Sequence, residues 1–352
     1  MTPHSQIIPV QAPNAEYSIY VGSGWLDVLP DLLAQRLLNG KVAFVTNSTL
    51  APIYGDKLRQ SVPGSVVISV PDGEQHKTLD TVRTLYDSFL AAGLDRKAII
   101  IAFGGGVIGD MVGFAAATYL RGVAFIQIPT SLLSMVDASV GGKVGVDLPQ
   151  GKNLIGAFKQ PEMVIIDTDV LTTLPDTEWR CGIAEVVKAG LLRDTSLLDA
   201  KIYTRENAVE FISKAVKFKV DIVQEDPYEN GVRAILNLGH TFGHAVEAVS
   251  QFQWRHGEAV ALGLVAAARL SQVHGLCEPN LPYRVESLVK SLGLPTRYKG
   301  YASADIRAAM NTDKKRSAGR MRYILLRAPG DPVIVSDVPD AKVISVLDSL
   351  RE

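Results

Sequence analysis

The sequence predicts an α/β N-terminal half built on a mostly parallel sheet, followed by a mainly α-helical C-terminal half. Up to about residue 170, short β-branched runs alternate with helical segments, which is typical of strands joined by helical crossovers. Beyond Pro175, long helical segments follow one another with few strand signals. A length of 352 residues suits two domains. We therefore expect a Rossmann-like domain over residues 1–173 and a helical domain over residues 174–352.

Five strands and one crossover helix are expected in the first half. The strand candidates are Val42–Thr46, Val66–Val70, Ala98–Phe103, Ala124–Ile128 and Met163–Asp167. Residues 78–92 place apolar side chains at helical spacing, and Gly93 follows them, as glycine often follows the end of a helix.

In the second half, helices are expected at Thr177–Leu192, Asn207–Val223, His240–Ser250 and Glu258–His274. Arg322–Leu326 and Val333–Val335 are expected to form a small hairpin, and Asp340 to cap a last helix. The apolar stretch Ala259–Ala268 is too short to span a bilayer, so we expect it to be a buried helix.

The composition argues against several classes of partner. The 36 lysine and arginine residues against 37 aspartate and glutamate residues leave a net charge of -1, so no overall positive field attracts nucleic acid or an anionic membrane. Two cysteines, Cys181 and Cys277, are too few for a disulfide framework. Residues 1–6 lack the basic start and apolar run of a secretory signal, so we expect a cytoplasmic protein.

A glycine-rich segment, Phe103–Asp110, lies between an expected strand and an expected helix. Its turn would let backbone N–H groups and a helix N-terminus approach a pyrophosphate. The segment fits G-x-G-x-x-G, but it begins about one hundred residues into the chain, and no acidic residue ends a strand at the usual later spacing. A plain strand-to-helix turn is therefore an equal alternative. The polar loop Pro71–Lys77 and Asn47 would help bind a ribose, although ordinary solvated turns explain both more simply.

Histidines cluster in the second half: three of the six, His240, His244 and His256, fall within seventeen residues. His240 and His244 are four residues apart, so on a helix both point the same way. This spacing nominates both as metal ligands, with Glu185 or Glu247 completing the set. Core or surface histidines are the alternative.

Scattered cations near turns and small residues form another candidate group. They are Arg121, Lys143, Lys152, Lys188, Lys219, Arg233 and Lys314–Lys315. Because the chain is neutral overall, their convergence would imply a small polyanionic substrate rather than a polymer. Solvated lysines are the default alternative, and for Lys188 that alternative is a surface ion pair with Glu185.

Taken together, these segments resemble the 3-dehydroquinate synthase family of sugar-phosphate cyclases along most of the chain. The most specific pieces are Pro129–Leu133 through Asp137–Lys143, Gly151–Phe158, Ala184–Lys188 and Asn237–Ala245. The resemblance implies a dehydroquinate synthase-like fold and a homodimeric lyase that uses NAD and one Zn²⁺ or Co²⁺. Its reaction belongs to the shikimate pathway, which leads to chorismate and the aromatic amino acids.

The implied substrate is a small phosphorylated keto acid, 3-deoxy-D-arabino-heptulosonate 7-phosphate. It would be converted to 3-dehydroquinate and phosphate by transient oxidation, β-elimination, reduction and an intramolecular aldol closure. NAD would be regenerated in each turnover.

The resemblance also implies roles for individual residues. The metal ligands would be Glu185, His240 and His256, with His244 contacting the substrate phosphate instead. The catalytic groups would be Asp137, Lys143, Glu185, Lys188 and His244. Lys219 and Arg233 would bind the substrate carboxylate. The phosphate would be bound by Lys152, Asn153, Asn237, His244, Lys314 or Lys315, and the partner subunit's Arg121. The cofactor contacts would be Asn47, Glu74, Lys77, Gly105, Gly106, Val107, Asp110, Thr130, Ser131, Lys143, Lys152 and Thr173.

Three other interpretations stay open. A polyol or glycerol-type metal dehydrogenase would share the glycine turn and the histidines but would not need Lys152–Asn153, Lys219, Arg233 or Asn237. Another sugar-phosphate cyclase is possible, including the variant that acts on an aminated substrate. A non-catalytic scaffold would be expected to lose at least one of the three metal ligands, and all three are present.

Overall fold

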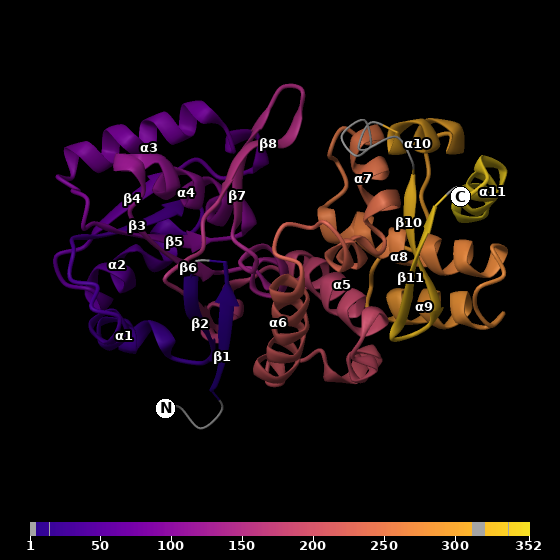
Figure 1. Ribbon diagram of the computed structural model, residues 1–352, viewed down its shortest axis with the longest axis horizontal. Coiled ribbons are helices and arrows are strands. Elements are labelled where there is room, and N and C mark those ends of the chain that lie inside the picture. The colour runs from indigo at the N-terminus through magenta and orange to yellow at the C-terminus, as the bar shows by residue number, and fades with distance from the viewer. Residues whose placement is uncertain (1–4, 14, 312–320, 337) are drawn as a thin grey trace. The chain divides into compact units, whose positions relative to one another are not determined.

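The computed structural model describes residues 5–13, 15–311, 321–336 and 338–352 (Figure 1). The chain forms two compact units. The first unit runs to Leu174 and also includes Ala208–Pro227, whereas the second contains Pro175–Asn207 and the chain from Tyr228 onward. The expected division into 1–173 and 174–352 therefore differs at one helix, α6 (Ala208–Glu225), which packs against strands of the first unit.

The first unit is built on a seven-stranded sheet with the order β1-β2-β9-β6-β5-β3-β4. The strands are β1 (Gln6–Ala12), β2 (Ala15–Gly22), β3 (Val42–Asn47), β4 (Val66–Val70), β5 (Ile99–Gly104), β6 (Ala124–Pro129) and β9 (Met163–Asp167). Over the described residues of this sheet, β1 pairs antiparallel with β2 and the other pairings are parallel, so the prediction of a mostly parallel sheet is confirmed. The β1–β2 hairpin was not expected.

Helices cover both faces of this sheet. Figure 1 shows α3 (Leu79–Ala91) and α4 (Gly106–Thr118) on one face, with α1 (Leu29–Gln35) and α2 (Ala51–Ser61) on the other. From β3 the chain moves outward to β4 and then crosses back to β5 on the other side of β3. In open parallel sheets, ligands bind beside the carboxyl ends of the strands at such a reversal. The carboxyl ends of β3 and β5 therefore mark the expected binding edge.

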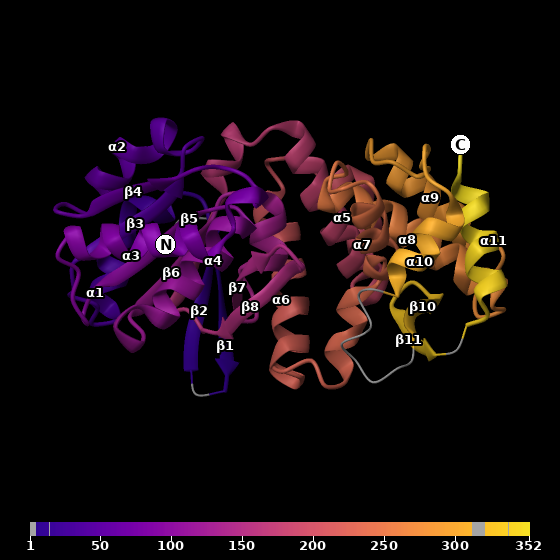
Figure 2. The same cartoon turned by 90° about the horizontal axis from the view of Figure 1, so that it is seen from above.

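A second hairpin, β7 (Lys143–Leu148) and β8 (Gly151–Phe158), stands apart from the main sheet. It lies beside α4 in both views, and Val144 and Val146 join the apolar core that α3 and α4 form on the sheet (Figures 1 and 2). Short helical turns η2 (Glu74–His76), η3 (Tyr119–Arg121), η4 (Ser134–Ala138) and η5 (Thr168–Thr173) complete the unit's connections.

The second unit is mainly helical. Its helices are α5 (Asp176–Leu192), α7 (His240–Val249), α8 (His256–Val273), α9 (Leu281–Ser291), α10 (Ser303–Met310) and α11 (Asp340–Leu350), with the hairpin β10 (Arg322–Ala328) and β11 (Asp331–Ser336). The expected helices and hairpin are confirmed within a few residues at each end. The expected cap at Asp340 is wrong, because Pro339 holds the cap position and Asp340 begins the helix.

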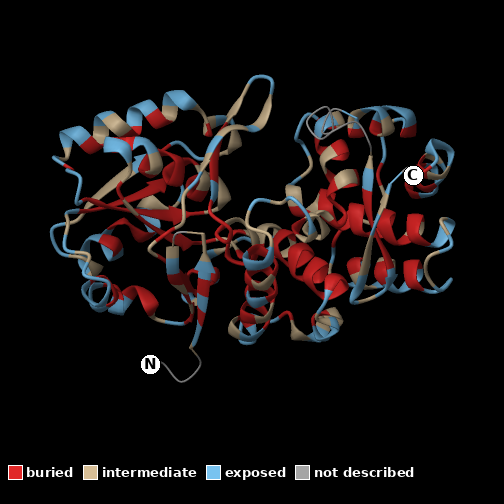
Figure 3. Ribbon diagram, in the orientation of Figure 1, coloured by how far each residue is buried: buried red, intermediate tan, exposed pale blue. Residues whose placement is uncertain are grey.

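Two helices of this unit are buried along most of their length, α5 and α8 (Figure 3). Residues 259–268 lie within α8 and are all buried, as expected for that apolar stretch. Among the described residues, none of the helices combines the length and the apolar character that crossing a membrane requires.

Candidate active site

Two charged residues lie inside the most buried part of α5. Every residue from Cys181 to Leu192 is buried, yet Glu185 and Lys188 stand among them at 3% and 4% exposure. The Lys188 ammonium contacts the Glu185 carboxylate. A charge taken out of water needs an opposite charge or a metal nearby. The surface ion pair considered for these residues is therefore wrong, and the pair is a buried feature of the site.

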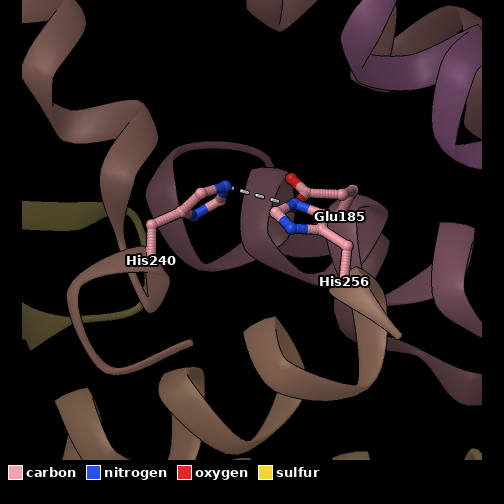
Figure 4. A group of neighbouring side chains, drawn as sticks. All are labelled: Glu185, His240 and His256. Atoms are coloured by element: carbon pink, nitrogen blue, oxygen red, sulfur yellow. Dashed lines mark ion pairs between the residues drawn. The ribbon is translucent and has the colours of Figure 1, made fainter. Parts of the chain in front are cut away.

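Two histidines approach Glu185 from neighbouring helices. His240 begins α7 and His256 begins α8, and their Nε2 atoms lie 3.5 Å and 3.6 Å from Glu185 Oε1. Figure 4 shows the three side chains turned toward a common point, and one ligand atom from each lies within 4.8 Å of the others. One carboxylate and two imidazoles leave coordination positions open, as a catalytic metal site requires. The donor set therefore fits a dication such as Zn²⁺ or Co²⁺.

Close backbone packing brings these ligands together. Gly239, which precedes His240, has φ 80°, and a Cβ there would lie 3.0 Å from the backbone N of Leu264. Gly257, which follows His256, is tighter still, since its Cβ would lie 2.3 Å from Cα of Cys181 on α5. Only glycine permits such approaches. Both glycines adjoin metal-ligand candidates, so the helix contacts set the spacing of the site.

His240 is held as a neutral ring. Burial and the nearby Lys188 ammonium lower the pKa of His240 to about 3. Its Nδ1 lies 3.2 Å from the carbonyl oxygen of Leu238, so Nδ1–H donates there and the Nε2 lone pair faces Glu185. A neutral ring with this tautomer is ready to bind a metal.

His256 has a carboxylate beside each ring nitrogen. Its Nε2 faces Glu185, and its Nδ1 lies 3.4 Å from Oε1 of Glu247. Burial alone would lower the pKa of His256, but hydrogen bonds to Glu185 and Glu247 raise it to about 10. Binding of a dication at Nε2 would replace the proton that these carboxylates hold in the metal-free protein.

His244 belongs to a different group. Its ring packs edge-on against that of His240, with 5.3 Å between the ring centres. Its ligand atom clusters with those of Glu247 and His256, not with those of Glu185 and His240. The pairing of His240 with His244 as joint ligands, which the four-residue spacing suggested, is therefore not what the described residues form.

Two other predicted binding residues of the second unit, Arg233 and Asn237, precede His240 in the chain. Arg233 is buried, and Asn237 donates its amide to Oε1 of Glu229 at 2.9 Å. Both lie on the short helix η8 (Val232–Asn237). Lys314 and Lys315 lie outside the described residues.

In the first unit, the glycine turn joins β5 to α4. Packing explains Gly104 and Gly109, because a Cβ would lie 2.6 Å from the Ile108 side chain in the first case and 2.9 Å from Gln127 Oε1 in the second. Gly105 is different. Its φ of −70° suits any residue, and its Cβ would meet nothing closer than Ser131 Oγ at 3.5 Å. Neither conformation nor packing requires a glycine there, so the missing side chain leaves space for a ligand at the N-terminus of α4.

Lys77 links several predicted binding residues. Its ammonium donates to Asp110 Oδ2 and to Asn153 Oδ1, both at 2.6 Å, and Lys77 is only 3% exposed. Burial raises the pKa of Asp110, and the nearby Lys77 opposes that rise. The loop from residue 71 to residue 77 is therefore more than a solvated turn, because it delivers a buried cation to α4 and to β8.

Asn47 and Thr130 lie where neighbouring strands end. Asn47 is the last residue of β3, and Thr130 follows β6 and donates its N–H to the carbonyl of Gly104. The Asn47 amide donates to Asp72 at 2.7 Å, and the Thr49 hydroxyl also donates to Asp72, at 2.6 Å. Asp72 has no individual role among the residues predicted from the sequence. The available signal was its place directly after a predicted strand.

The remaining predicted residues of the first unit are also placed. Gly106 and Val107 form the first turn of α4, Ser131 bonds to Ser134, Thr173 bonds to Tyr54, Glu74 pairs with Lys152, Lys143 begins β7, and Arg121 is exposed in η3. Lys219 on α6 donates to Oδ1 of Asp137 at 2.7 Å. The substrate-binding prediction for Lys219 thus falls on a residue of the first unit, not the second.

A glycine turn on a parallel sheet, in one chain with a carboxylate–imidazole triad on buried helices, is a combination that polyol-type metal dehydrogenases share, and it fits the class of the metal-dependent sugar-phosphate cyclases. A solved structure of this class, a 2-epi-5-epi-valiolone synthase from Streptomyces hygroscopicus with NAD⁺ and Zn²⁺ bound, matches at a TM-score of 0.88 and 29% identity, over 97% of this chain and 98% of that one. The chain belongs to the 3-dehydroquinate synthase family: residues 67–181 match the family's N-terminal model and residues 182–316 its C-terminal model.

Curated relatives agree with this membership. A 3-dehydroquinate synthase from Acidithiobacillus ferrooxidans is 46% identical, over 97% of this chain and 98% of that protein. Another from Halorhodospira halophila is 44% identical, over 97% of this chain and 99% of that protein. The resemblance expected from the sequence is thereby confirmed.

Proposed function

We propose that the protein has 3-dehydroquinate synthase activity and converts 3-deoxy-D-arabino-heptulosonate 7-phosphate to 3-dehydroquinate and phosphate. The observation that carries this proposal is the convergence of Glu185, His240 and His256, in a chain that belongs to this family over nearly its whole length. The product supplies aromatic amino acid biosynthesis by the shikimate pathway.

The cofactors we propose are NAD at the glycine turn and one Zn²⁺ or Co²⁺ at the triad. The open N-terminus of α4 at Gly105 and the donor set of the triad both fit these groups, and the Streptomyces relative carries NAD⁺ and Zn²⁺. When bound, NAD supplies a reversible hydride acceptor and the dication supplies a Lewis acid for substrate hydroxyls. The cofactor contacts would be those named from the sequence, among which the buried Lys77 ammonium pairs with the partly buried Asp110 carboxylate.

The chain's own cations would bind and orient the substrate. Lys219 and Arg233 are both buried, which suits a carboxylate that must be held in one place. Asp137 holds the Lys219 ammonium in position. Lys152, Asn153, Asn237, His244 and one of Lys314 and Lys315 would bind the phosphate. Such fixed contacts orient the leaving group for β-elimination.

Around the reacting alcohol, the proposed roles follow from charge and burial. Lys188 holds a positive charge beside Glu185 where water is excluded, so its effect on a developing alkoxide is stronger than at a surface. Asp137 and Lys143 would position the alcohol and take part in proton transfer. His240, kept neutral, would act as a ligand and not as an acid.

We propose further that the enzyme is a cytoplasmic homodimer and that the partner subunit's Arg121 completes the phosphate site. Support comes from the exposed position of Arg121 on η3 and from two free cysteines, which suit a reducing compartment. Light scattering should give twice the chain mass, and Arg121→Ala should raise KM for the phosphorylated substrate. A monomer with full activity would contradict this part of the proposal.

A phosphate-release assay tests the activity itself. Protein supplied with NAD, Co²⁺ and the heptulosonate phosphate should release inorganic phosphate without lasting accumulation of NADH. Lasting NADH in amounts that match the substrate consumed would favour the polyol dehydrogenase instead. The aminated analogue, assayed in parallel, distinguishes the aminodehydroquinate variant, because only that variant would turn it over faster than the heptulosonate.

A further inference from the structure

Glu247 is a buried carboxylate that the proposed reaction does not use. It lies on α7 at 5% exposure, two turns after His240. Its Oε1 is 3.4 Å from Nδ1 of His256, while Nε2 of the same ring faces Glu185 at 3.6 Å. One imidazole therefore stands between two carboxylates, with one carboxylate beside each ring nitrogen.

The other histidine of the triad follows the same pattern with a different acceptor. Nδ1 of His240 bonds to the carbonyl oxygen of Leu238, and its Nε2 faces Glu185. In both rings Nδ1 lies beside an acceptor oxygen of the protein, and Nε2 faces the Glu185 carboxylate. Histidines that bind metals usually donate the other N–H to a carboxylate or a carbonyl, which fixes the tautomer and the ring orientation.

We propose that Glu247 is a positioning residue that holds His256 with Nδ1 protonated and Nε2 directed at the dication, and that Glu247 is not itself a ligand. The inference depends on the metal named under the proposed function. The Glu247 carboxylate also adds a negative charge beside the metal site. This charge favours binding of a dication and makes the His256 imidazole a stronger electron-pair donor to the metal.

The same cluster offers a competing arrangement. His244, Glu247 and His256 also bring ligand atoms within 4.8 Å of one another. A second ion there, together with the first, would require His256 to bind metal through both nitrogens and to lose both ring protons. A neutral imidazole has one acceptor nitrogen only. The arrangement with one ion and a Glu247 acceptor needs no such deprotonation.

Backbone contacts anchor Glu247 where the chain turns toward His256. The Glu247 carbonyl accepts from the backbone N of Phe252 at 2.7 Å and from the Ser250 hydroxyl at 3.0 Å. These bonds close the turn after α7, and α8 begins at His256. Glu247 and His256 therefore lie at the two ends of one short connection between α7 and α8, which these hydrogen bonds hold in place.

Three variants test the proposal: Glu247→Ala, Glu247→Gln and the control Glu286→Gln. Glu286 is also a largely buried carboxylate of the second unit, paired with Arg269 at 2.6 Å. The dissociation constant for Co²⁺ is measured on metal-free protein by chelator competition, together with the visible absorption spectrum of bound Co²⁺. We expect Glu247→Ala to weaken Co²⁺ binding by about 10- to 100-fold and to change the spectrum. Glu247→Gln should lose less, because its amide oxygen still accepts from Nδ1–H.

The outcomes separate the interpretations. Unchanged Co²⁺ affinity and spectrum in Glu247→Ala would overturn the positioning role. A second equivalent of Co²⁺ in the parent that both Glu247 variants lose would overturn it as well, because Glu247 would then be a ligand. Should Glu247→Ala not fold, Glu247→Gln decides by the same two measurements, judged against Glu286→Gln. None of these measurements uses the substrate, so failure of the proposed activity would show separately, as absent phosphate release from the parent.

Discussion

Replacing Gly257 with alanine tests whether the contact between α5 and α8 sets the geometry of the metal site. The new Cβ would lie 2.3 Å from both Cα and the carbonyl oxygen of Cys181. Ordinary contacts begin at 3.4 Å, so the two helices must separate locally by about 1 Å. Both neighbouring atoms are backbone, so no side-chain rotation relieves the clash.

The expected loss of stability follows from two opposing terms. Overpacking of a buried contact costs about 1–3 kcal/mol, and rigid backbone neighbours put this case at the upper end. The higher helix propensity of alanine than of glycine offsets about 1 kcal/mol of this loss in the free energy of unfolding. The free energy of unfolding of the metal-free protein should therefore fall by about 2 kcal/mol, as measured by urea unfolding. Because His256 adjoins Gly257 and Glu185 lies one turn after Cys181, Co²⁺ affinity should fall as well.

Gly55→Ala is the matched control, since it makes the same substitution inside α2. Its Cβ would lie 3.5 Å from the Arg59 guanidinium, an ordinary contact with the movable end of a side chain. This variant should gain up to about 1 kcal/mol and keep parental Co²⁺ affinity. If Gly257→Ala were as stable as Gly55→Ala, or bound Co²⁺ like the parent, the reasoning about α5 and α8 would be refuted.

Three further perturbations probe separate parts of the molecule. Glu185→Gln should weaken metal retention by more than the roughly 10- to 100-fold typical of an outer partner, because it removes a ligand charge; metal analysis after desalting checks this, and a fully loaded variant would contradict it. Lys77→Met leaves the partly buried Asp110 carboxylate without its cation, so we expect a loss of about 1–3 kcal/mol in unfolding free energy and weaker NAD binding by fluorescence titration. Parental stability in that variant would show that the pair contributes nothing. Burial raises the pKa of Asp167 above its unfolded value, so the folded state holds this proton more tightly, and Asp167 stabilises the fold less as pH rises through the folded pKa. The unfolding free energy of the parent minus that of Asp167→Asn should therefore fall as the pH rises above about 4, the usual pKa of an aspartate, and a rise would mean that the backbone N–H groups around Asp167 lower its pKa instead.

The sheet was predictable where strands are buried on both faces. Met163–Asp167 matches the prediction at both ends, because a continuous run of apolar residues is a strong strand signal. The hairpin β1–β2 and the hairpin β7–β8 were missed. Their strands alternate buried and exposed positions or carry glycines, so no apolar run marks them.

The metal site shows a different limit of sequence reasoning. Spacing along one helix nominated His244, but the histidine that meets Glu185 with His240 is His256, which comes from the next helix. That meeting depends on the approach of Gly257 to α5, which is a tertiary contact that no periodicity reveals. A surface ion pair with Lys188 was the default interpretation of Glu185, yet every residue of α5 from Cys181 to Leu192 is buried. Only the family resemblance named the three residues, Glu185, His240 and His256, whose ligand atoms the structure brings together.

The path of α6 has a consequence for how the protein can be made. After β9 the chain forms α5 in the second unit. It then contributes Ala208–Pro227 to the first unit and continues in the second unit from Tyr228. Phe211, Ile212 and Val216 of this returning helix are fully or almost fully buried. A fragment truncated after Leu174 would therefore expose the apolar surface that α6 covers. During translation, the sheet stays without its α6 cover until a segment some thirty residues later has been synthesised. We therefore expect gene fragments that end after Leu174 to yield insoluble protein.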